Sequence, residues 1–208
     1  YEIMPSLVGS EMCIRDSVAG DFNLVNFNID RDRYILIPYI KAARQINPNL
    51  RIWASPWCPP PWMKTNNHYA SAVRPSGEKD VNGLLPREAI AEFSTGFRME
   101  EGYLKTYADY FARFIKAYEA EGLPLECIHV QNEPCSNQVF PSCKWRTEDL
   151  TFFLGHYLGP TFERENIKAD IYFGTINTSN PDYVRTALRD EQAAKYIKGV
   201  GFQWDGKK

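Results

Sequence analysis

The chain has 208 residues, 44% of them apolar and 24% charged, which is an ordinary globular composition and argues against disorder. Its 24 basic and 26 acidic residues leave a formal net charge of −2, so the charge balance predicts no nucleic-acid partner and no anionic membrane surface. No apolar run approaches the roughly 20 residues of a membrane span. We therefore expect one soluble-type domain, or part of one.

Residues 1–17 do not resemble native protein sequence. The segment Leu7–Ser17 can be encoded by DNA that resembles a common transposase sequencing adapter, and Tyr1–Ile3 fits the primer that precedes such an adapter. The segment also lacks the basic start and the apolar stretch of about 7–15 residues that a signal peptide needs. We expect residues 1–17 to be a translated adapter that packs poorly, and residues 18–208 to be the native part.

The first elements of the native part are a helix, a strand and a long loop. Asp30 is expected to cap a helix over 31–46, and Pro38 is expected to kink that helix. A short apolar strand over 50–54 follows. Residues 65–100 have no clear period and are rich in Asn, Ser, Gly and Pro, which predicts a loop of functional rather than incidental length.

A strong helix and three further strands come next. Aromatic residues recur at helical spacing over 103–118, and Gly122 and Pro124 end that helix. We expect this aromatic stripe to pack in the core. The later elements are a strand over 127–131, a helix over 148–158 capped by Thr147, a strand over 170–174, a helical stretch from Asn180 to Lys198 that breaks near Asp190 and is ended by Gly199, and a strand over 200–204.

Strands that alternate with helices predict a parallel sheet. No glycine-rich phosphate loop follows any strand, which disfavours a nucleotide-binding doubly wound fold and leaves a barrel. The predicted fold class is therefore an α/β TIM barrel, present as about four consecutive β/α units of the eight. Because parallel strands end on the same side, Ser55, Glu133, Asn177 and Gln203 should lie together.

The cysteines and histidines give no metal signal. The native part has four cysteines without a CxxC pair, and its three histidines are scattered, so no metal or cofactor is expected. Cys135 and Cys143 are close enough in sequence to close a small disulfide loop, but buried free thiols are the favoured interpretation.

Glu133 is the sharpest catalytic candidate. It follows an apolar strand and precedes Pro134, and a carboxyl half-buried there by aromatic side chains would have a raised pKa and could donate a proton. A carboxylate paired with a nearby Arg or Lys is the structural alternative. Trp57 and Trp62 could both be core residues, and Trp62, in a proline-rich loop beyond the strand, is the better ligand platform of the two.

Two motifs carry a resemblance to a known family. Residues 54–66 (Ala-Ser-Pro-Trp-Cys-Pro-Pro-Pro-Trp-Met-Lys-Thr-Asn) and residues 131–134 (Gln-Asn-Glu-Pro) resemble glycoside hydrolase family 30, and the resemblance extends over residues 21–208. That family includes lysosomal glucosylceramidase and bacterial and fungal β-1,6-glucanases. A lone Asn-Glu-Pro is a weak signal, whereas two long motifs in this order are a specific one.

The resemblance implies a (β/α)8 barrel with a flanking β-sandwich and a retaining two-carboxylate mechanism without a cofactor. Glu133 matches the general acid/base, and Asn132 matches the residue that hydrogen-bonds the sugar 2-hydroxyl. Trp62 matches an aromatic that lines the sugar subsite, and Gln203 and Trp204 are the further substrate-binding candidates. An extracellular, periplasmic or cell-surface location is also implied.

Two departures from the family refine these expectations. The family's nucleophilic Glu lies at the end of the seventh strand, so it is expected beyond residue 208, and this chain alone is expected to be inactive. Glucosylceramidases carry His-Trp-Tyr where residues 203–205 are Gln-Trp-Asp, a form closer to the β-1,6-glucanases. The leading expectation is an endo-β-1,6-glucanase. The alternatives are a β-glucosidase or glucosylceramidase of the same family, and a non-catalytic carbohydrate-binding relative.

Overall fold

The computed structural model of the chain describes residues 18–74 and 82–203. Four parallel strands form one sheet in the order β1-β2-β3-β4, so neighbours in the sheet are also consecutive in the chain. The strands are β1 (Trp53–Ala54), β2 (Cys127–His129), β3 (Asp170–Ile176) and β4 (Ile197–Phe202). This confirms the predicted parallel α/β sheet. The predictions for residues 1–17 and for Trp204 fall outside the described residues.

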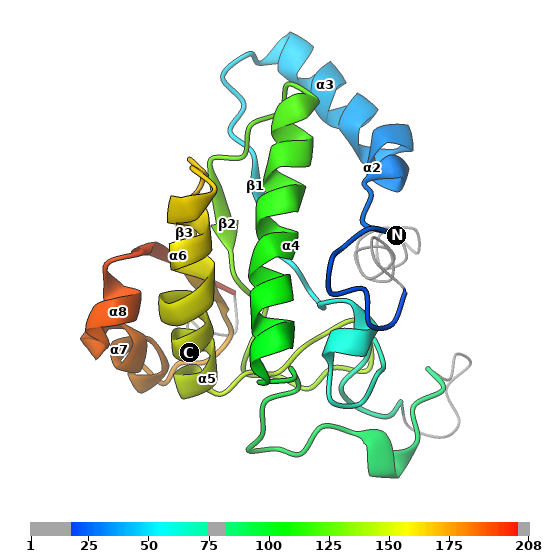
Figure 1. Cartoon of the computed structure of the whole chain (residues 1–208), viewed down its shortest axis with the longest axis vertical. Helices are drawn as coiled ribbons and strands as arrows, with labels where there is room; N and C mark the ends of the chain where they lie inside the picture. The colour runs from blue at the N-terminus through cyan, green and yellow to red at the C-terminus, as the bar shows by residue number, and fades with distance from the viewer. Residues whose placement is uncertain (1–17, 75–81, 204–208) are drawn as a thin grey trace.

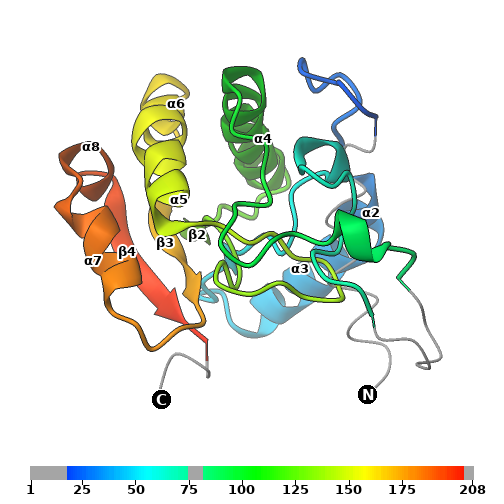
Figure 2. The same cartoon turned by 90° about the horizontal axis from the view of Figure 1, so that it is seen from below.

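Helices fill the connections between the strands. They are α2 (Asp30–Tyr34), α3 (Leu36–Ile46), α4 (Glu101–Ala120), α5 (Thr147–Phe153), α6 (Gly159–Arg164), α7 (Asp182–Arg189) and α8 (Glu191–Ala194), with the 3-10 turns η2 (Pro61–Met63) and η3 (Pro86–Glu88) and the π-helical segment η4 (Leu154–Leu158). Figures 1 and 2 show α4, α5–α6 and α7–α8 along one face of the sheet. Parallel strands require crossover connections of this kind, because each strand must begin again at the same edge of the sheet.

The first predicted helix is two helices. It is interrupted at Ile35, where φ is −114°, and resumes at Leu36. Pro38 has no N–H to bond the carbonyl four residues earlier, on Tyr34, and its ring crowds that carbonyl, so the helix is destabilised at this point. The helix therefore breaks one turn before the proline instead of kinking at it. Asp30 is the first helical residue rather than the cap, which is Ile29.

Helix α4 confirms the predicted aromatic stripe. Its inward side chains include Tyr107 and Phe111, both buried, and the Tyr107 ring stacks on Phe97 and on Phe153 of α5. Gly122 adopts φ +76°, which favours glycine, and the N–H of the next residue bonds the carbonyl of Tyr118. This cluster of rings is the centre of the core between the helices and the sheet.

The helix after β2 is longer than predicted. It does not end at Leu158 but continues through η4 into α6, so that Pro160 lies inside it. A π-helical turn just before a proline shifts the hydrogen-bond pattern that the missing N–H would break. Thr147 is the first helical residue rather than the cap, which is Arg146, and its hydroxyl donates to the carbonyl of Tyr183 at 2.5 Å.

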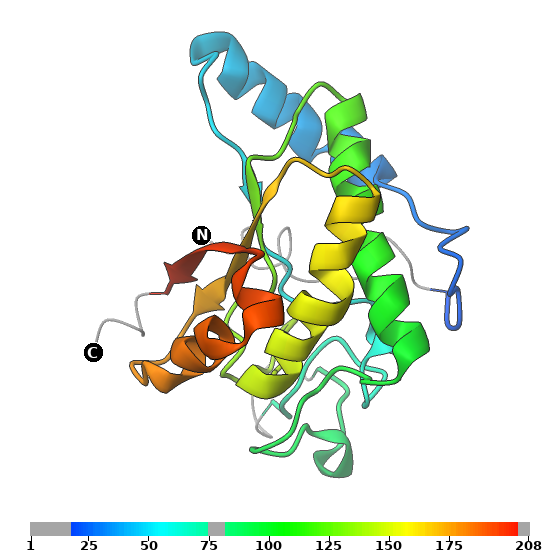
Figure 3. The same cartoon turned by 60° about the vertical axis from the view of Figure 1, so that its left-hand side comes forward.

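The last helix and strand differ most from prediction. The break at Asp190 is confirmed, and the Asp190 carboxylate accepts from the N–H of Ala193 at 2.9 Å. The helix ends at Ala194 rather than Lys198, and β4 begins at Ile197 rather than at residue 200. Ile197 pairs with Ile171 of β3, and this pairing satisfies backbone groups that local helix propensity could not. Figure 3 shows β3 and β4 side by side.

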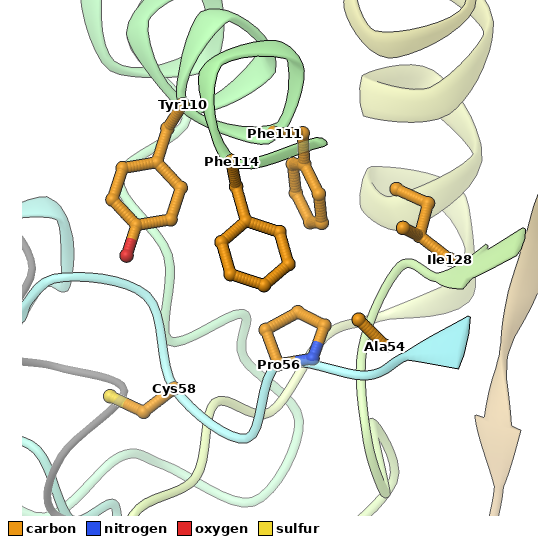
Figure 4. Close-up of a pocket in the computed structure, with 7 residues that line it drawn as sticks. All are labelled: Ala54, Pro56, Cys58, Tyr110, Phe111, Phe114 and Ile128. Atoms are coloured by element: carbon orange, nitrogen blue, oxygen red, sulfur yellow. The ribbon is translucent and has the colours of Figure 1, made fainter. Parts of the chain in front are cut away.

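A small cavity of about 20 Å³ lies between α4 and the start of the sheet. Figure 4 shows Tyr110, Phe111 and Phe114 of α4 pointing from the helix toward its other lining residues, Ala54, Pro56, Cys58 and Ile128. A volume of this size holds about one water molecule, and an apolar lining offers that water no partners. The cavity is therefore a packing gap behind the sheet and not the binding site.

Candidate active site

Polar residues gather at the carboxyl ends of the four strands. Ser55, Glu133, Asn177 and Gln203 each lie at or just beyond the end of one parallel strand, as the sequence predicted. Two hydrogen bonds join these ends across the sheet: the Gln203 amide donates to Asn132 Oδ1 at 2.8 Å, and the backbone N–H of Cys135 donates to Asn177 Oδ1 at 3.1 Å.

Glu133 lies in a turn that the sheet itself holds. Its φ is +47°, an unusual conformation for a residue with a Cβ, and its N–H donates to the carbonyl of Thr175 on β3 at 3.0 Å. Strained backbone of this kind clusters at functional sites. The side chain is half-buried, and its Oε2 accepts from Gln138 Nε2 at 3.2 Å. The carboxylate is thus positioned by an amide donor from its own loop.

Asn132 presents an amide whose orientation is set by its neighbours. The residue is 5% exposed, and its Oδ1 accepts from Thr175 Oγ1 and from Gln203 Nε2, both at 2.8 Å. With two donors on the oxygen, the amide nitrogen must face the other way. Asn132 therefore offers a hydrogen-bond donor beside Glu133 in a defined direction.

Gln131 joins the loops that follow β1 and β2. It is fully buried, its Nε2 donates to the carbonyls of Trp57 and Asn132 at 2.9 Å each, and its Oε1 accepts from Trp145 Nε1 at 3.3 Å. The sequence analysis did not single out this residue. In the sequence, only its place in the Gln-Asn-Glu-Pro motif pointed to it. A buried side chain that joins two loops by hydrogen bonds produces no periodic sequence pattern.

The two tryptophans predicted as alternatives have different surroundings. Trp62, the favoured ligand platform, is 7% exposed and packs against Phe22 and Tyr103, with ring centroids 5.3 and 5.8 Å away. Trp57 is half-buried and lies 5.6 Å from the ring of Phe140 in the loop after β2. The structure therefore places Trp62 in the core, and Trp57 is the tryptophan that Gln131 attaches to the strand ends.

The thiols near the site are free, as favoured from the sequence, and Cys135 and Cys143 form no disulfide. Burial raises the pKa of the Cys135 thiol to about 12 and also raises that of Cys143. Tyr183, a partly buried residue beside Cys135, has a pKa raised by the same cause. Within residues 18–74 and 82–203, no group of three His, Cys, Asp or Glu side chains could hold a metal ion.

The loop after β1 is anchored by a buried lysine that the sequence analysis left unassigned. Lys64 lies inside the first motif, is fully buried, and donates from Nζ to the carbonyl of Ser142 at 2.6 Å and to that of Ala70 at 3.0 Å. Ser142 in turn exchanges hydrogen bonds with Gln138, the residue that contacts Glu133. The first motif and the second are therefore parts of one network.

These features define a class of protein: a parallel α/β fold of the barrel type, in which polar residues gather at the carboxyl ends of the strands. Residues 8–83 and 90–207 match the Glycosyl hydrolase family 30 TIM-barrel domain, and the chain belongs to that family.

Individual relatives agree with this assignment. The endo-1,6-β-D-glucanase neg1 of Aspergillus fumigatus is 28% identical over 88% of this chain and 35% of its own length. The lysosomal acid glucosylceramidase of Mus musculus is 26% identical over 89% of this chain and 33% of its own length. The crystal structure of SrfJ from Salmonella typhimurium matches with a TM-score of 0.70 and 27% identity, over 91% of this chain and 38% of that chain. The chain spans about a third of the length of the curated relatives it matches.

Proposed function

We propose that the protein carrying this chain is a retaining β-glycoside hydrolase in which Glu133 is the general acid/base. The observation that carries the proposal is the half-buried Glu133 carboxylate at the end of β2, next to the oriented amide of Asn132, in a chain of glycosyl hydrolase family 30. The alternative of a non-catalytic sugar-binding relative is distinguished by the same experiment.

Hydrolysis of a glycosidic bond with retention requires a carboxyl group that can donate a proton. A glycosidic oxygen is a poor leaving group until it is protonated, and Glu133 would donate that proton in the first step. A second carboxylate, roughly 5–5.5 Å away, would attack the anomeric carbon and form the glycosyl–enzyme intermediate. Glu133, now ionised, would then take a proton from the water that hydrolyses the intermediate. The family resemblance assigns the nucleophile to a strand that follows β4.

Asn132 would act on the sugar rather than on the leaving group. Its Nδ2 would donate to the 2-hydroxyl, and hydrogen bonds to that hydroxyl strengthen as the oxocarbenium-like transition state develops. An interaction that is stronger in the transition state than in the bound substrate raises the rate of the chemical step. Trp57 and Gln203 would then line the sugar subsite, and Trp62, packed on Phe22 and Tyr103, would support it from the core.

We propose a β-1,6-linked glucan as the substrate. Support comes from the Gln-Trp-Asp sequence at residues 203–205 and from the endo-1,6-β-D-glucanase relative. A glucosyl lipid or simple β-glucoside is the second candidate, which the glucosylceramidase relative favours. The location proposed with a polysaccharide substrate is extracellular, periplasmic or at the cell surface. Among the described residues, no helix is both long and apolar enough to cross a membrane.

The test uses the complete gene product on a linear β-1,6-glucan and on a glucosyl lipid. Glu133→Gln should lower turnover of the preferred substrate by about 10²–10⁴-fold, because it removes the proton donor. It should lower the first step of dinitrophenyl glucoside hydrolysis far less, since that leaving group needs no protonation. Glu92→Gln, a change at an exposed carboxylate of the long loop, is the matched control and should leave both rates unchanged.

Each outcome decides one part of the proposal. Glucan hydrolysis without lipid hydrolysis supports the glucanase, and the reverse supports the second candidate. Sugar binding without turnover would overturn the enzyme in favour of a binding protein. Equal loss on activated and unactivated substrates in Glu133→Gln would exclude Glu133 as the acid.

A further inference from the structure

Core and non-core side chains alternate along the first part of β3, and this alternation is broken near the carboxyl end of the strand. Ile171 and Phe173 are core residues two positions apart, as expected on a strand, but the next core residue is Ile176, three positions further on. The pairing of β3 with β4 shifts register in the same stretch, between Tyr172 and Thr175. Regular alternation would have placed Thr175 in the layer with Ile171 and Phe173.

Gly174 makes this irregularity possible. A Cβ at position 174 would lie 2.9 Å from the carbonyl oxygen of Gln131, closer than a real Cβ comes to a backbone oxygen. β2 and β3 therefore approach too closely here for any side chain. A glycine at such a point is typical of a bulge or of a close backbone contact.

The irregularity brings Thr175 onto Asn132. The two residues form an isolated parallel bridge beyond the end of β2, and the buried Thr175 hydroxyl donates to Asn132 Oδ1 at 2.8 Å. Gln203, beyond the end of β4, donates to the same oxygen at 2.8 Å. Both groups donate to the oxygen of the amide, so an amide flipped by 180° would set its NH2 group against the Gln203 NH2 and would force the Thr175 hydroxyl to turn from donor to acceptor.

We propose that Thr175 is a positioning residue, which together with Gln203 locks the Asn132 amide with Nδ2 toward the substrate. The role rests on the proposed function, in which Nδ2 donates to the sugar 2-hydroxyl. Thr175 contacts Asn132 rather than the sugar, so its loss removes the direction of a donor and not the donor itself. The contribution of the 2-hydroxyl to catalysis should therefore depend on Thr175.

The test compares aryl β-glucosides with their 2-deoxy analogues in the complete protein. The ratio of the two kcat/KM values measures what the 2-hydroxyl contributes, and comparing this ratio between variants cancels the intrinsic reactivity of the substrates. Thr175→Val, which keeps the shape but removes the hydroxyl, should lower the ratio by about tenfold, the effect of one lost hydrogen bond. Thr175→Ser, which keeps the hydroxyl, should restore the wild-type ratio.

A matched control separates positioning from packing. Thr151 on α5 is buried, and its hydroxyl has no hydrogen-bond partner among the described residues, so Thr151→Val makes the same chemical change away from the site. It should leave the ratio unchanged. Equal losses on both substrates in Thr175→Val would overturn the proposal, since a general structural defect would act on both alike.

A second measurement does not depend on activity. In ¹⁵N-resolved spectra of the complete protein, the Asn132 side-chain NH2 should rotate slowly about its C–N bond, and Thr175→Val should speed that rotation and shift both protons. An Asn132 signal that is unchanged in Thr175→Val overturns the positioning role even if the enzyme is inactive. Absence of all β-glucoside hydrolysis by the wild type would instead overturn the proposed function alone.

Discussion

Replacement of the buried Lys64 by Met tests the network beneath the site. Lys64 Nζ donates to the carbonyls of Tyr69, Ala70 and Ser142 and to Ser71 Oγ over distances from 2.6 to 3.2 Å. Met fills a similar volume without the ammonium, so the change removes these bonds and leaves little cavity. The complete protein, unfolded in urea and followed by tryptophan fluorescence, reports the loss as a change in the free energy of unfolding.

The expected size follows from two opposing contributions. The ammonium has three N–H groups to share among these four oxygens, so it makes at most three full hydrogen bonds, which at about 1.5–3 kcal/mol each would stabilise the fold by roughly 4.5–9 kcal/mol. The desolvation of a buried ammonium offsets several kcal/mol of this. Each carbonyl also keeps another donor: Ser142 N–H on Tyr69, Asn66 Nδ2 on Ala70, and Ser71 Oγ on Ser142. With no orphaned carbonyl, we expect Lys64→Met to destabilise by about 2–4 kcal/mol.

Lys105→Met on α4 is the matched control, because the Lys105 side chain is 67% exposed and forms an ion pair of 3.6 Å with exposed Glu101. Such a surface change should alter the free energy of unfolding by less than about 0.5 kcal/mol. If Lys64→Met is no less stable than Lys105→Met, then the ammonium is not a structural centre and the reasoning is wrong.

Two further predictions concern packing and thiol chemistry. A Cβ at Gly159 would lie 2.1 Å from the Tyr196 ring, so Gly159→Ala should lower the free energy of unfolding by about 1–3 kcal/mol in the same urea assay. A Cβ at Gly122 would meet open space, so Gly122→Ala should cost only the strain of its left-handed backbone, about 1–2 kcal/mol. With the pKa of Cys135 raised to about 12, only on the order of 10⁻⁴ of this thiol is ionised at pH 8, so iodoacetamide should label it slowly until urea unfolds the protein. Rapid native labelling, found by peptide mass spectrometry, would contradict that burial.

Local patterns in the sequence determined the class of fold and the position of the site. The aromatic side chains of α4 recur at helical spacing, and the apolar runs before Glu133 and Asn177 are short and β-prone, which favours buried strands. Once the strands are known to be parallel, their ends must meet, so the grouping of the strand-end residues followed without coordinates. Strand boundaries were not predictable in this way. β4 begins three residues earlier than expected because the edge of β3 offers hydrogen-bonding partners to its backbone.

The residues that hold the site were decided by tertiary structure alone. Lys64 looks like a surface lysine in the sequence. Its own loop folds back to give the ammonium three oxygen acceptors, on residues 69–71, and the distant loop after β2 adds the carbonyl of Ser142. The sequence allows both Trp57 and Trp62 to be core residues or ligand platforms. The packing of Phe22 and Tyr103 against Trp62 buries that tryptophan. Sequence periodicity records which face of an element is apolar. It carries no record of contacts between residues that are far apart in the chain, and such contacts, from Thr175 and Gln203, position the Asn132 amide.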